Sequence, residues 1–409
     1  MTAKDIKCRS CGETGLTQIL DLGKTPLANA LLTKEQTQQP EEVFPLDLYF
    51  CPHCKLLQIS ETVSPEKLFR DYFYFSSFST TAIENARSIA FRLVKERKLD
   101  KHNLVVELAS NDGYLLKHYQ EKGIPVLGIE PAENIAKVAN EQGIPTIPEF
   151  FTSDFATTLR QKYPNGADVM HANNVLAHVA DLNGFVEGIA KMLNATGVAV
   201  IECPYGKILV DNVEFDTIYH EHLCYYTVTA LQKLFIRHGL TLQDVELLPI
   251  HGGSLRLFVG HEPKISEAVR HFLAEEEKWG VNTADVYLTL AKKVETLKED
   301  LTSLLKDLKS QGKRIAAYGA SAKGATLLNY FQINSNYLDY VVDRSTVKQG
   351  YYTPGSHLEI LAPEKLLEDK PDYALLLTWN FWEEIVTQQD AYRKAGGKFI
   401  IPIPDIRII

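Results

Sequence analysis

Long apolar runs are absent from this 409-residue sequence, in which no segment reaches the roughly 18 uncharged apolar residues that a membrane-spanning helix needs. The opening segment MTAKDIKCRSCG also lacks the apolar core of a signal peptide. Basic residues are fewer than acidic ones, with 43 Lys and Arg against 52 Asp and Glu, which gives a net charge of -9. A nucleic-acid partner would require a basic face. We therefore expect a cytoplasmic protein with neither a membrane nor a nucleic-acid partner.

Cysteine is scarce, with six in the chain, but four of the six form two CxxC pairs. In a cytoplasmic chain this spacing favours a metal site over disulfide bonds. Four thiolates complete the tetrahedral shell of zinc and leave no position for water, so we expect a structural zinc ion. Two unrelated thiol pairs or a redox motif are the alternatives. The expected ligands are Cys8, Cys11, Cys51 and Cys54.

Short apolar runs alternate with helical stretches through most of the chain, and this alternation predicts an α/β fold with two parallel sheets flanked by helices. The runs that are typical of buried strands are LVVEL (104–108), PVLGIE (125–130), ADVMHA (167–172), GVAVIE (197–202), RIAAYG (314–319), DYVVD (339–343), YALLLTW (373–379) and KFIIPIP (398–404). Residues 203–260 are less regular, and a long helix is expected at about 283–310. We expect three domains, at residues 1–65, 66–260 and 261–409.

A strand, a turn of small residues and a helix start follow one another in VVELASNDGYLL (105–116). In class I methyltransferases the first strand ends in an acidic residue before such a turn, and Glu107 and Gly113 occupy the corresponding places. Glu130 ends the next strand, where a carboxylate can accept hydrogen bonds from both ribose hydroxyls of a nucleoside. A Rossmann oxidoreductase shares these features, but ASNDG does not match GxGxxG, which favours S-adenosylmethionine. The cofactor candidates are Glu107, Ser110, Asn111, Asp112, Gly113, Glu130, Pro131, Phe150, Asn173 and Asn174.

The run IYHEHLCYY follows the last strand of the first sheet, near the edge where ligands usually bind. Methylation of a carbon atom requires a base that removes a proton beside a carbonyl and a group that stabilises the resulting oxyanion. Histidine suits the first task because it titrates near neutral pH, and tyrosine suits the second. Metal binding by His220 and His222, or simple packing, are the alternatives. The catalytic candidates in this run are Tyr219, Glu221 and His222.

Several motifs occur in a fixed order along the chain. They are the two CxxC pairs, YFSS, ELASNDG, IYHEHLCYY, GGSLR (252–256), YGASAKG (318–324) and TWNF (378–381). This ordered set spans essentially the whole chain and resembles the sugar C-methyltransferases of deoxysugar biosynthesis, which make 3-C-methyl branched sugars on dTDP or related carriers. The resemblance implies an N-terminal zinc-binding domain, a class I Rossmann-like methyltransferase domain and a C-terminal Rossmann-like α/β domain that helps hold the nucleotide sugar.

The resemblance also implies roles for individual residues. His222 would remove the proton at C3 of the sugar, next to a C4 ketone, with Tyr219 and Glu221 assisting. His178 and Tyr74 would line the same pocket. The substrate would be a nucleotide-linked keto sugar. Independently of the resemblance, we expect a monomer or a weak dimer.

The turn in YGASAKG joins a strand to a helix start and contains Lys323, which suits a phosphate group, although a tight turn for helix packing is the alternative. The substrate-binding candidates are His220, Arg256, Tyr318, Ser321 and Lys323. Three other hypotheses stay open. They are methyl transfer to oxygen or nitrogen of a related sugar, a nicotinamide-dependent oxidoreductase built on this turn, and a non-catalytic zinc-bearing binding protein.

Overall fold

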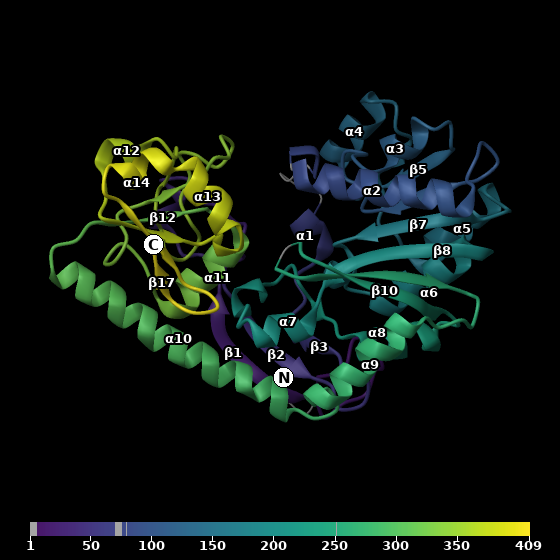
Figure 1. The fold of residues 1–409 in the computed structure, drawn as a ribbon, viewed down its shortest axis with the longest axis horizontal. Helices are drawn as coiled ribbons and strands as arrows, with labels where there is room; N and C mark the ends of the chain where they lie inside the picture. The colour runs from purple at the N-terminus through teal and green to yellow at the C-terminus, as the bar shows by residue number, and fades with distance from the viewer. Residues whose placement is uncertain (1–5, 70–75, 79, 251) are drawn as a thin grey trace.

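The computed structural model describes residues 6–69, 76–78, 80–250 and 252–409 of the chain. The strands form three sheets, of four, seven and six strands. In Figure 1 the seven-stranded and six-stranded sheets lie at opposite ends of the molecule, and the four-stranded N-terminal sheet lies between them along the lower side of the view. The predicted α/β fold with two Rossmann-like sheets is confirmed.

The N-terminal sheet is antiparallel and includes a strand from far along the chain. Its order is β1-β2-β3-β9, and β3 pairs with β9. Leu46 and Leu48 of β2 are buried on either side of the more accessible Asp47, so one side of this strand faces the core. The strands are β1 (Thr17–Thr25), β2 (Phe44–Phe50), β3 (Leu57–Ile59) and β9 (Cys224–Tyr225).

The central sheet has the order β10-β11-β8-β7-β4-β5-β6. Strands β4 to β8 run parallel, whereas β11 is antiparallel to β8 and β10 is antiparallel to β11. The chain moves from β4 to β5 on one side and returns to the other side of β4 as β7, which creates a crevice at the carboxyl ends of these strands. The strands are β4 (Val105–Leu108), β5 (Val126–Ile129), β6 (Thr146–Ile147), β7 (Ala167–Asn173), β8 (Leu193–Pro204), β10 (Thr241–Leu248) and β11 (Ser254–Gly260).

Strands β10 and β11 correct the expectation of irregular structure up to residue 260. Their pairing is antiparallel, and a bulge between Leu242 and Asp244 breaks the alternation that would have marked β10 in the sequence. Arg256 also interrupts the apolar pattern of β11. The two strands therefore carry a weaker sequence signal than the parallel strands, which are buried on both faces.

Successive residues of the central strands point to opposite faces, and each face packs on its own helices. Val105 of β4 lies in a buried cluster with Ala86 of α2 and Tyr119 of α3. The next residue, Val106, lies in the main cluster, which includes Phe185 of α6. The helices of this domain are α2 (Thr80–Arg97), α3 (Leu116–Gln120), α4 (Glu133–Glu141), α5 (Ser153–Lys162), α6 (Leu182–Met192), α7 (Gly206–Asp211), α8 (Val228–Arg237) and α9 (Glu267–Trp279).

The C-terminal sheet has the order β14-β13-β12-β15-β16-β17, in which β12 to β16 are parallel and β17 is antiparallel to β16. Its strands are β12 (Ile315–Tyr318), β13 (Val341–Val342), β14 (Ile360–Leu361), β15 (Tyr373–Leu376), β16 (Lys398–Ile401) and β17 (Arg407–Ile408). Its helices are α11 (Ala322–Phe331), α12 (Lys365–Asp369), α13 (Trp382–Gln388) and α14 (Asp390–Lys394).

The predicted long helix is α10 (Asp285–Ser310), which runs along one side of the molecule toward the C-terminal domain (Figure 1). A short helix, α1 (Pro65–Phe69), follows the N-terminal sheet. Across the described ranges, no helix combines the length and the apolar character that crossing a membrane requires.

Candidate active site

A pocket of about 710 Å³ lies at the carboxyl ends of the central strands and reaches the C-terminal domain. Its wall combines residues that follow β4, β5 and β7 with residues of the segment before β9 and with the start of α11. The sequence-predicted residues that line it are Asn111, Glu130, Pro131, Phe150, Asn173, Asn174, His178, Tyr219, His222, Ser321 and Lys323. One cavity therefore brings together candidates for cofactor binding, catalysis and phosphate binding.

Glu130 forms the acidic part of the cofactor side of this pocket. Its carboxylate accepts hydrogen bonds from the backbone N–H groups of Asn111 (2.9 Å) and Ala132 (2.9 Å). Burial raises the pKa of Glu130, and the two backbone donors oppose this shift. The turn after β4 is tight, because Ala109 and Asn111 both have left-handed backbone angles (φ 52° and 49°). These features fit the nucleoside of S-adenosylmethionine, whose ribose hydroxyls Glu130 would hold.

Four predicted cofactor residues do not line the pocket, although they lie in β4 or in the turn that follows it. They are Glu107, Ser110, Asp112 and Gly113. Glu107 is 1% exposed, and neither of its carboxyl oxygens has a hydrogen-bond partner in the described part of the chain. Burial, followed by the nearby acids, raises the pKa of Glu107 well above its usual value, which favours the neutral carboxylic acid. Gly113 has φ 79°, and a Cβ there would approach Ile144 Cγ1 to 2.9 Å, so this position requires glycine.

His222 is held in one tautomer at the pocket wall. Its Nδ1 lies 2.9 Å from the carbonyl oxygen of Thr217, which can only accept a hydrogen bond. In the neutral ring this contact places the proton on Nδ1 and leaves Nε2 as an acceptor, and the Tyr219 hydroxyl donates to Nε2 at 2.9 Å. The ring of His178 meets that of His222 edge-on, with centroids 4.7 Å apart. Burial lowers the pKa of His178 to about 4, so this neighbour adds no positive charge near neutral pH.

Glu221 and His220 lie in the same segment but do not line the pocket. Glu221 is 6% exposed, and its Oε1 accepts a hydrogen bond from Nδ2 of Asn29 at 2.6 Å. His220 is buried, and its Nε2 donates to the carbonyl oxygen of Pro45 at 3.1 Å. His220 was expected to contact the substrate, but its ring instead bonds the Pro45 carbonyl in the N-terminal domain. Among the residues that the structure describes, neither His220 nor His222 belongs to a group of side chains that could hold a metal ion.

The C-terminal wall of the pocket contains a lysine between two acids. Ser321 caps the first turn of α11, and the Lys323 ammonium lies 4.9 Å from the centroid of the Trp379 ring. Trp379 donates a hydrogen bond from Nε1 to Asp216 at 2.7 Å. Burial raises the pKa of Glu214 and of Asp216, and the charge of Lys323 opposes both shifts. Within the described residues Lys323 Nζ is buried without a hydrogen-bond partner.

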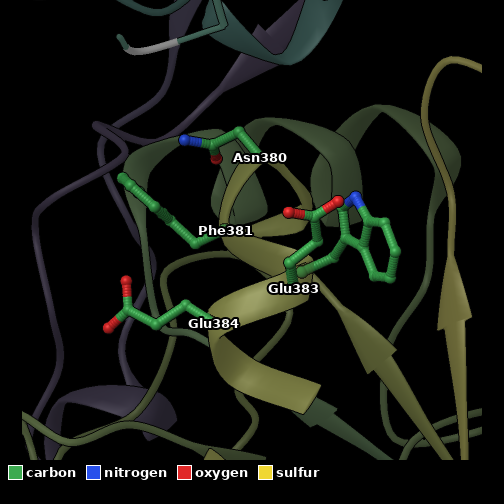
Figure 2. A pocket seen from close by; sticks show the side chains of 5 residues that line it. Asn380, Phe381, Glu383 and Glu384 are labelled. Atoms are coloured by element: carbon green, nitrogen blue, oxygen red, sulfur yellow. The ribbon is translucent and has the colours of Figure 1, made fainter. Parts of the chain in front are cut away.

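Several pocket residues carried no sequence-based assignment. Asn380 and Phe381, from the TWNF motif, line both the main pocket and a smaller hollow of about 370 Å³ at the start of α13 (Figure 2). Glu214 and Thr217 also line the main pocket and lie just before the YHEH run. These four residues lie within or next to the TWNF and YHEH motifs, and this closeness in sequence could have identified them as pocket residues.

Arg256 and Tyr318 differ from expectation, because neither lines the pocket. Arg256 is 5% exposed on β11 and is paired with the carboxylate of Glu202 at 2.7 Å. It also donates to Oδ1 of Asn85 at 2.6 Å, so its guanidinium is used to fix α2 on the sheet. Tyr318 is buried at the end of β12. Tyr74 lies outside the described residues.

The four predicted zinc ligands form one cluster. The Sγ atoms of Cys8, Cys11, Cys51 and Cys54 all lie within 4.8 Å of one another. Thiolates that bind one zinc ion at about 2.3 Å lie about 3.8 Å apart in a tetrahedron, so the cluster has the size and the donors that zinc requires. The four cysteines are not joined by disulfide bonds. The site would complete its shell with protein ligands alone, which suits a structural role.

Three family models match successive parts of the chain. A zinc binding domain model covers residues 8–69, a methyltransferase domain model covers 82–245, and a C-methyltransferase C-terminal domain model covers 249–404. The C-methyltransferase NovU of Streptomyces niveus is 34% identical over 406 residues, which span 98% of this chain and 96% of NovU. The chain belongs to the C-methyltransferase family. For this C-methyltransferase, the predicted enzyme class, the methyl donor S-adenosylmethionine and the four-cysteine zinc site are confirmed.

Solved structures also resemble part of this C-methyltransferase. Magnesium protoporphyrin IX methyltransferase from Synechocystis is 14% identical, with 44% of this chain and 83% of that chain covered and a TM-score of 0.35. An S-adenosylmethionine-dependent methyltransferase from Clostridium acetobutylicum is 12% identical, with 44% and 91% covered and a TM-score of 0.35. Because the chain belongs to this family, two of the alternative hypotheses are wrong, namely the nicotinamide-dependent oxidoreductase and the non-catalytic zinc-bearing binding protein.

Proposed function

We propose that this C-methyltransferase places a methyl group on C3 of a nucleotide-linked 4-keto deoxysugar, with His222 as the base that forms the enolate. The observation that supports this most directly is the position of His222. His222 lines the same pocket as Glu130, the expected ribose ligand of the cofactor. Carbon methylation needs a base and a methyl donor that reach one substrate atom from a single cavity.

The reaction can be followed through the residues of the chain. Nε2 of His222 takes the proton from C3, the C3–H electron pair forms a C3–C4 double bond, and the C4 oxygen becomes an enolate oxyanion. The Thr217 carbonyl, 2.9 Å from Nδ1, stabilises the imidazolium that results. Protonation of Nε2 releases the Tyr219 hydroxyl, which can then donate to the oxyanion.

S-adenosylmethionine, when bound, supplies an electrophilic methyl group whose C–S bond breaks as the enolate carbon forms a C–C bond, leaving S-adenosylhomocysteine. The C4 ketone is restored in the same step. His222 then returns its proton to water and is neutral for the next cycle.

Residues in the C-terminal wall of the pocket favour a substrate in which the sugar is linked to a nucleotide. The start of α11, which Ser321 caps, and the buried ammonium of Lys323 suit a pyrophosphate. Phe381 is 45% exposed at the pocket and offers an aromatic face to a base. The cytoplasmic location and the monomer or weak dimer remain predictions.

The test is mass spectrometry of the purified protein with S-adenosylmethionine and a panel of nucleotide-linked 4-keto-6-deoxy sugars. We expect one substrate to gain one methyl group, and carbon NMR of that product should show the methyl carbon bonded to C3. A methyl group found on oxygen or nitrogen would contradict the proposed chemistry. Activity restricted to acceptors without a ketone would contradict the proposed substrate.

A further inference from the structure

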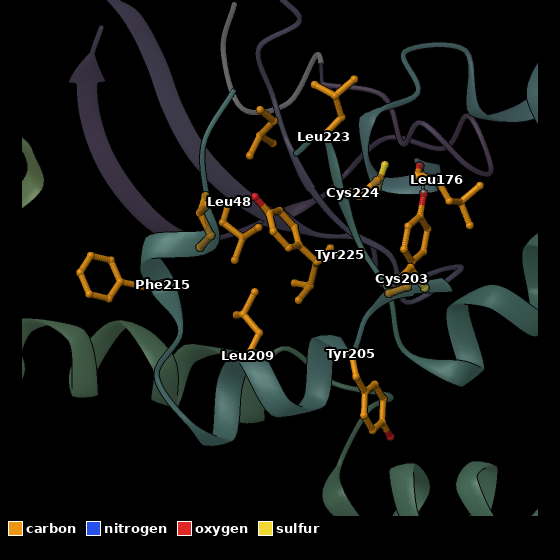
Figure 3. Packing of buried hydrophobic residues seen from close by; sticks show 14 of the residues in the cluster. Leu48, Leu176, Cys203, Tyr205, Leu209, Phe215, Leu223, Cys224 and Tyr225 are labelled. Atoms are coloured by element: carbon orange, nitrogen blue, oxygen red, sulfur yellow. Dashed lines mark hydrogen bonds between the residues drawn. The ribbon is translucent and has the colours of Figure 1, made fainter. Parts of the chain in front are cut away.

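The catalytic segment, defined as residues 219–222, continues directly into strand β9 of the N-terminal sheet. The backbone N–H of Ile59 in β3 donates to the carbonyl oxygen of Leu223 at 3.0 Å, immediately after the segment. Leu223, Tyr225 and Leu48 of β2 belong to one buried cluster (Figure 3). The zinc-bearing sheet therefore holds one end of the catalytic segment by backbone pairing.

Two side-chain contacts reach the same segment from the N-terminal domain. Asn29, in the connection between β1 and β2, donates to Glu221 at 2.6 Å. The His220 ring bonds the Pro45 carbonyl and meets the Phe44 ring edge-on, with centroids 5.7 Å apart. Asn29 is itself exposed, so core packing does not account for its contact with the buried Glu221 carboxylate.

The central domain holds the catalytic segment from the other side. The backbone N–H of Leu223 donates to the carbonyl oxygen of Ala177 at 2.7 Å, and Nδ1 of His222 is fixed by Thr217. Because Glu221 precedes His222 and does not line the pocket, its carboxylate can affect the position of the base through the backbone between them. A displacement of about 1 Å at a reacting group can lower a rate on the order of 100-fold.

We propose that Asn29 is a positioning residue for methyl transfer, which holds Glu221 and so sets the direction in which His222 presents Nε2 to the substrate. This inference rests on the function proposed above. It gives the N-terminal domain a part in placing the base, in addition to its zinc site.

The variant Asn29→Asp tests this role, because it keeps the shape of the side chain and replaces an N–H donor with a carboxylate that repels Glu221. The matched control is Asn183→Asp. Asn183 also bridges the two domains, donating to the Arg9 carbonyl at 2.9 Å, but it does not line the pocket. Two readouts are needed. One is exchange of the substrate C3 proton with deuterated water at saturating sugar, and the other is the imidazole 15N spectrum of the protein without substrate.

We expect Asn29→Asp to slow exchange by about 10-fold or more, to move the His222 nitrogen resonances, and to leave the Kd for S-adenosylmethionine unchanged. Asn183→Asp should alter neither readout. If Asn29→Asp behaves like Asn183→Asp in both, the positioning role is overturned. If the wild-type protein exchanges no proton on any keto sugar, the proposed function is wrong, and the His222 resonances alone then decide whether Asn29 positions the ring.

Discussion

The N-terminal and C-terminal sheets both meet the central domain at the active site, but they do so by different bonds. The N-terminal sheet takes β9 of the central domain into its own backbone ladder. The C-terminal domain makes side-chain contacts, such as the Trp379 hydrogen bond to Asp216 and the Thr326 hydroxyl bond to the Ile218 carbonyl at 3.4 Å. Both domains thus hold the segment between residues 214 and 225. The N-terminal domain uses main-chain pairing together with side-chain contacts such as that of Asn29 with Glu221, whereas the C-terminal contacts named here come from side chains.

This difference indicates that the two domains have separate roles, one in fixing the catalytic base and the other in binding the substrate. Backbone pairing cannot be lost at one position without disturbing the strand, so the N-terminal sheet can fix the base in place. Side-chain contacts can be lost singly, so changes in the C-terminal wall should alter substrate binding while the base stays in position. Variants on either side can separate these two effects.

Loss of the zinc site should have the largest effect. Cys51→Ser removes a ligand from a site that can supply on the order of 10 kcal/mol of folding free energy. We expect loss of bound zinc, a lower Tm and loss of C3 proton exchange, measured by metal analysis, thermal unfolding and NMR. Cys203→Ala is the control, because Cys203 is equally buried but lies outside the cluster, and it should retain zinc. Full exchange activity in zinc-free Cys51→Ser would contradict the role given to the N-terminal sheet.

Removal of the lysine charge in the C-terminal wall should act on binding. Lys323→Met keeps the length of the side chain but leaves Glu214 and Asp216 without their compensating cation. We expect KM for the nucleotide sugar to rise by about 10-fold or more, with proton exchange at saturating sugar close to that of the wild type. Lys298→Met is the control, because Lys298 also lies over an aromatic ring, at 4.4 Å from the Tyr330 centroid, outside the pocket. An unchanged KM with a lower exchange rate would reverse the division between the two sheets.

A smaller effect, on the pH dependence of stability, is expected from a substitution of His171 in the core of the central sheet. Burial lowers the pKa of His171 from 6.5 to about 3, so the unfolded chain takes up this proton first as pH falls. Keeping the His171 ring neutral in the folded protein costs no free energy above pH 6.5. As the pH falls from 6.5 toward about 3, the free energy of unfolding decreases by up to about 1.4 kcal/mol per pH unit. His171→Gln lacks this dependence. Denaturant unfolding should show its deficit relative to wild type shrinking by about 1.4 kcal/mol between about pH 7.5 and 5.5.

Tyr119→Phe is the control for that experiment. It removes the hydroxyl that lies 2.8 Å from Nε2 of His171 but leaves the titrating ring in place. Its stability deficit should therefore stay constant over the same pH range. A constant deficit in His171→Gln would show that this ring does not resist protonation in the folded protein.

The features that the sequence predicted well are those written in neighbouring residues. Strands β4, β5, β7 and β8 each contain a short run that is mostly apolar, because parallel central strands are buried on both faces. The zinc ligands were predictable because each CxxC pair places two thiolates on one turn. Glu130 directly follows strand β5, and His222 belongs to the YHEH run, so both could be singled out from local sequence, and both line the pocket.

The features that the sequence did not predict depend on residues that are distant in the chain. Nothing in the two-residue strand β9 indicates that it joins β3 instead of the central sheet. Arg256 was a substrate-binding candidate in the sequence, but Glu202 and Asn85, distant in the chain, occupy its guanidinium. The contact between Asn29 and Glu221 likewise has no local signal, because it forms only when the N-terminal domain docks.

The most direct test of the account is proton exchange at C3 of the accepted sugar in deuterated water, with S-adenosylhomocysteine in place of the methyl donor. The wild-type protein should exchange this proton without any methyl transfer. His222→Gln should lower the exchange rate by about 100-fold or more while it still binds S-adenosylmethionine. Undiminished exchange in His222→Gln would contradict the assignment of the base, and absence of exchange in the wild type would contradict the enolate itself.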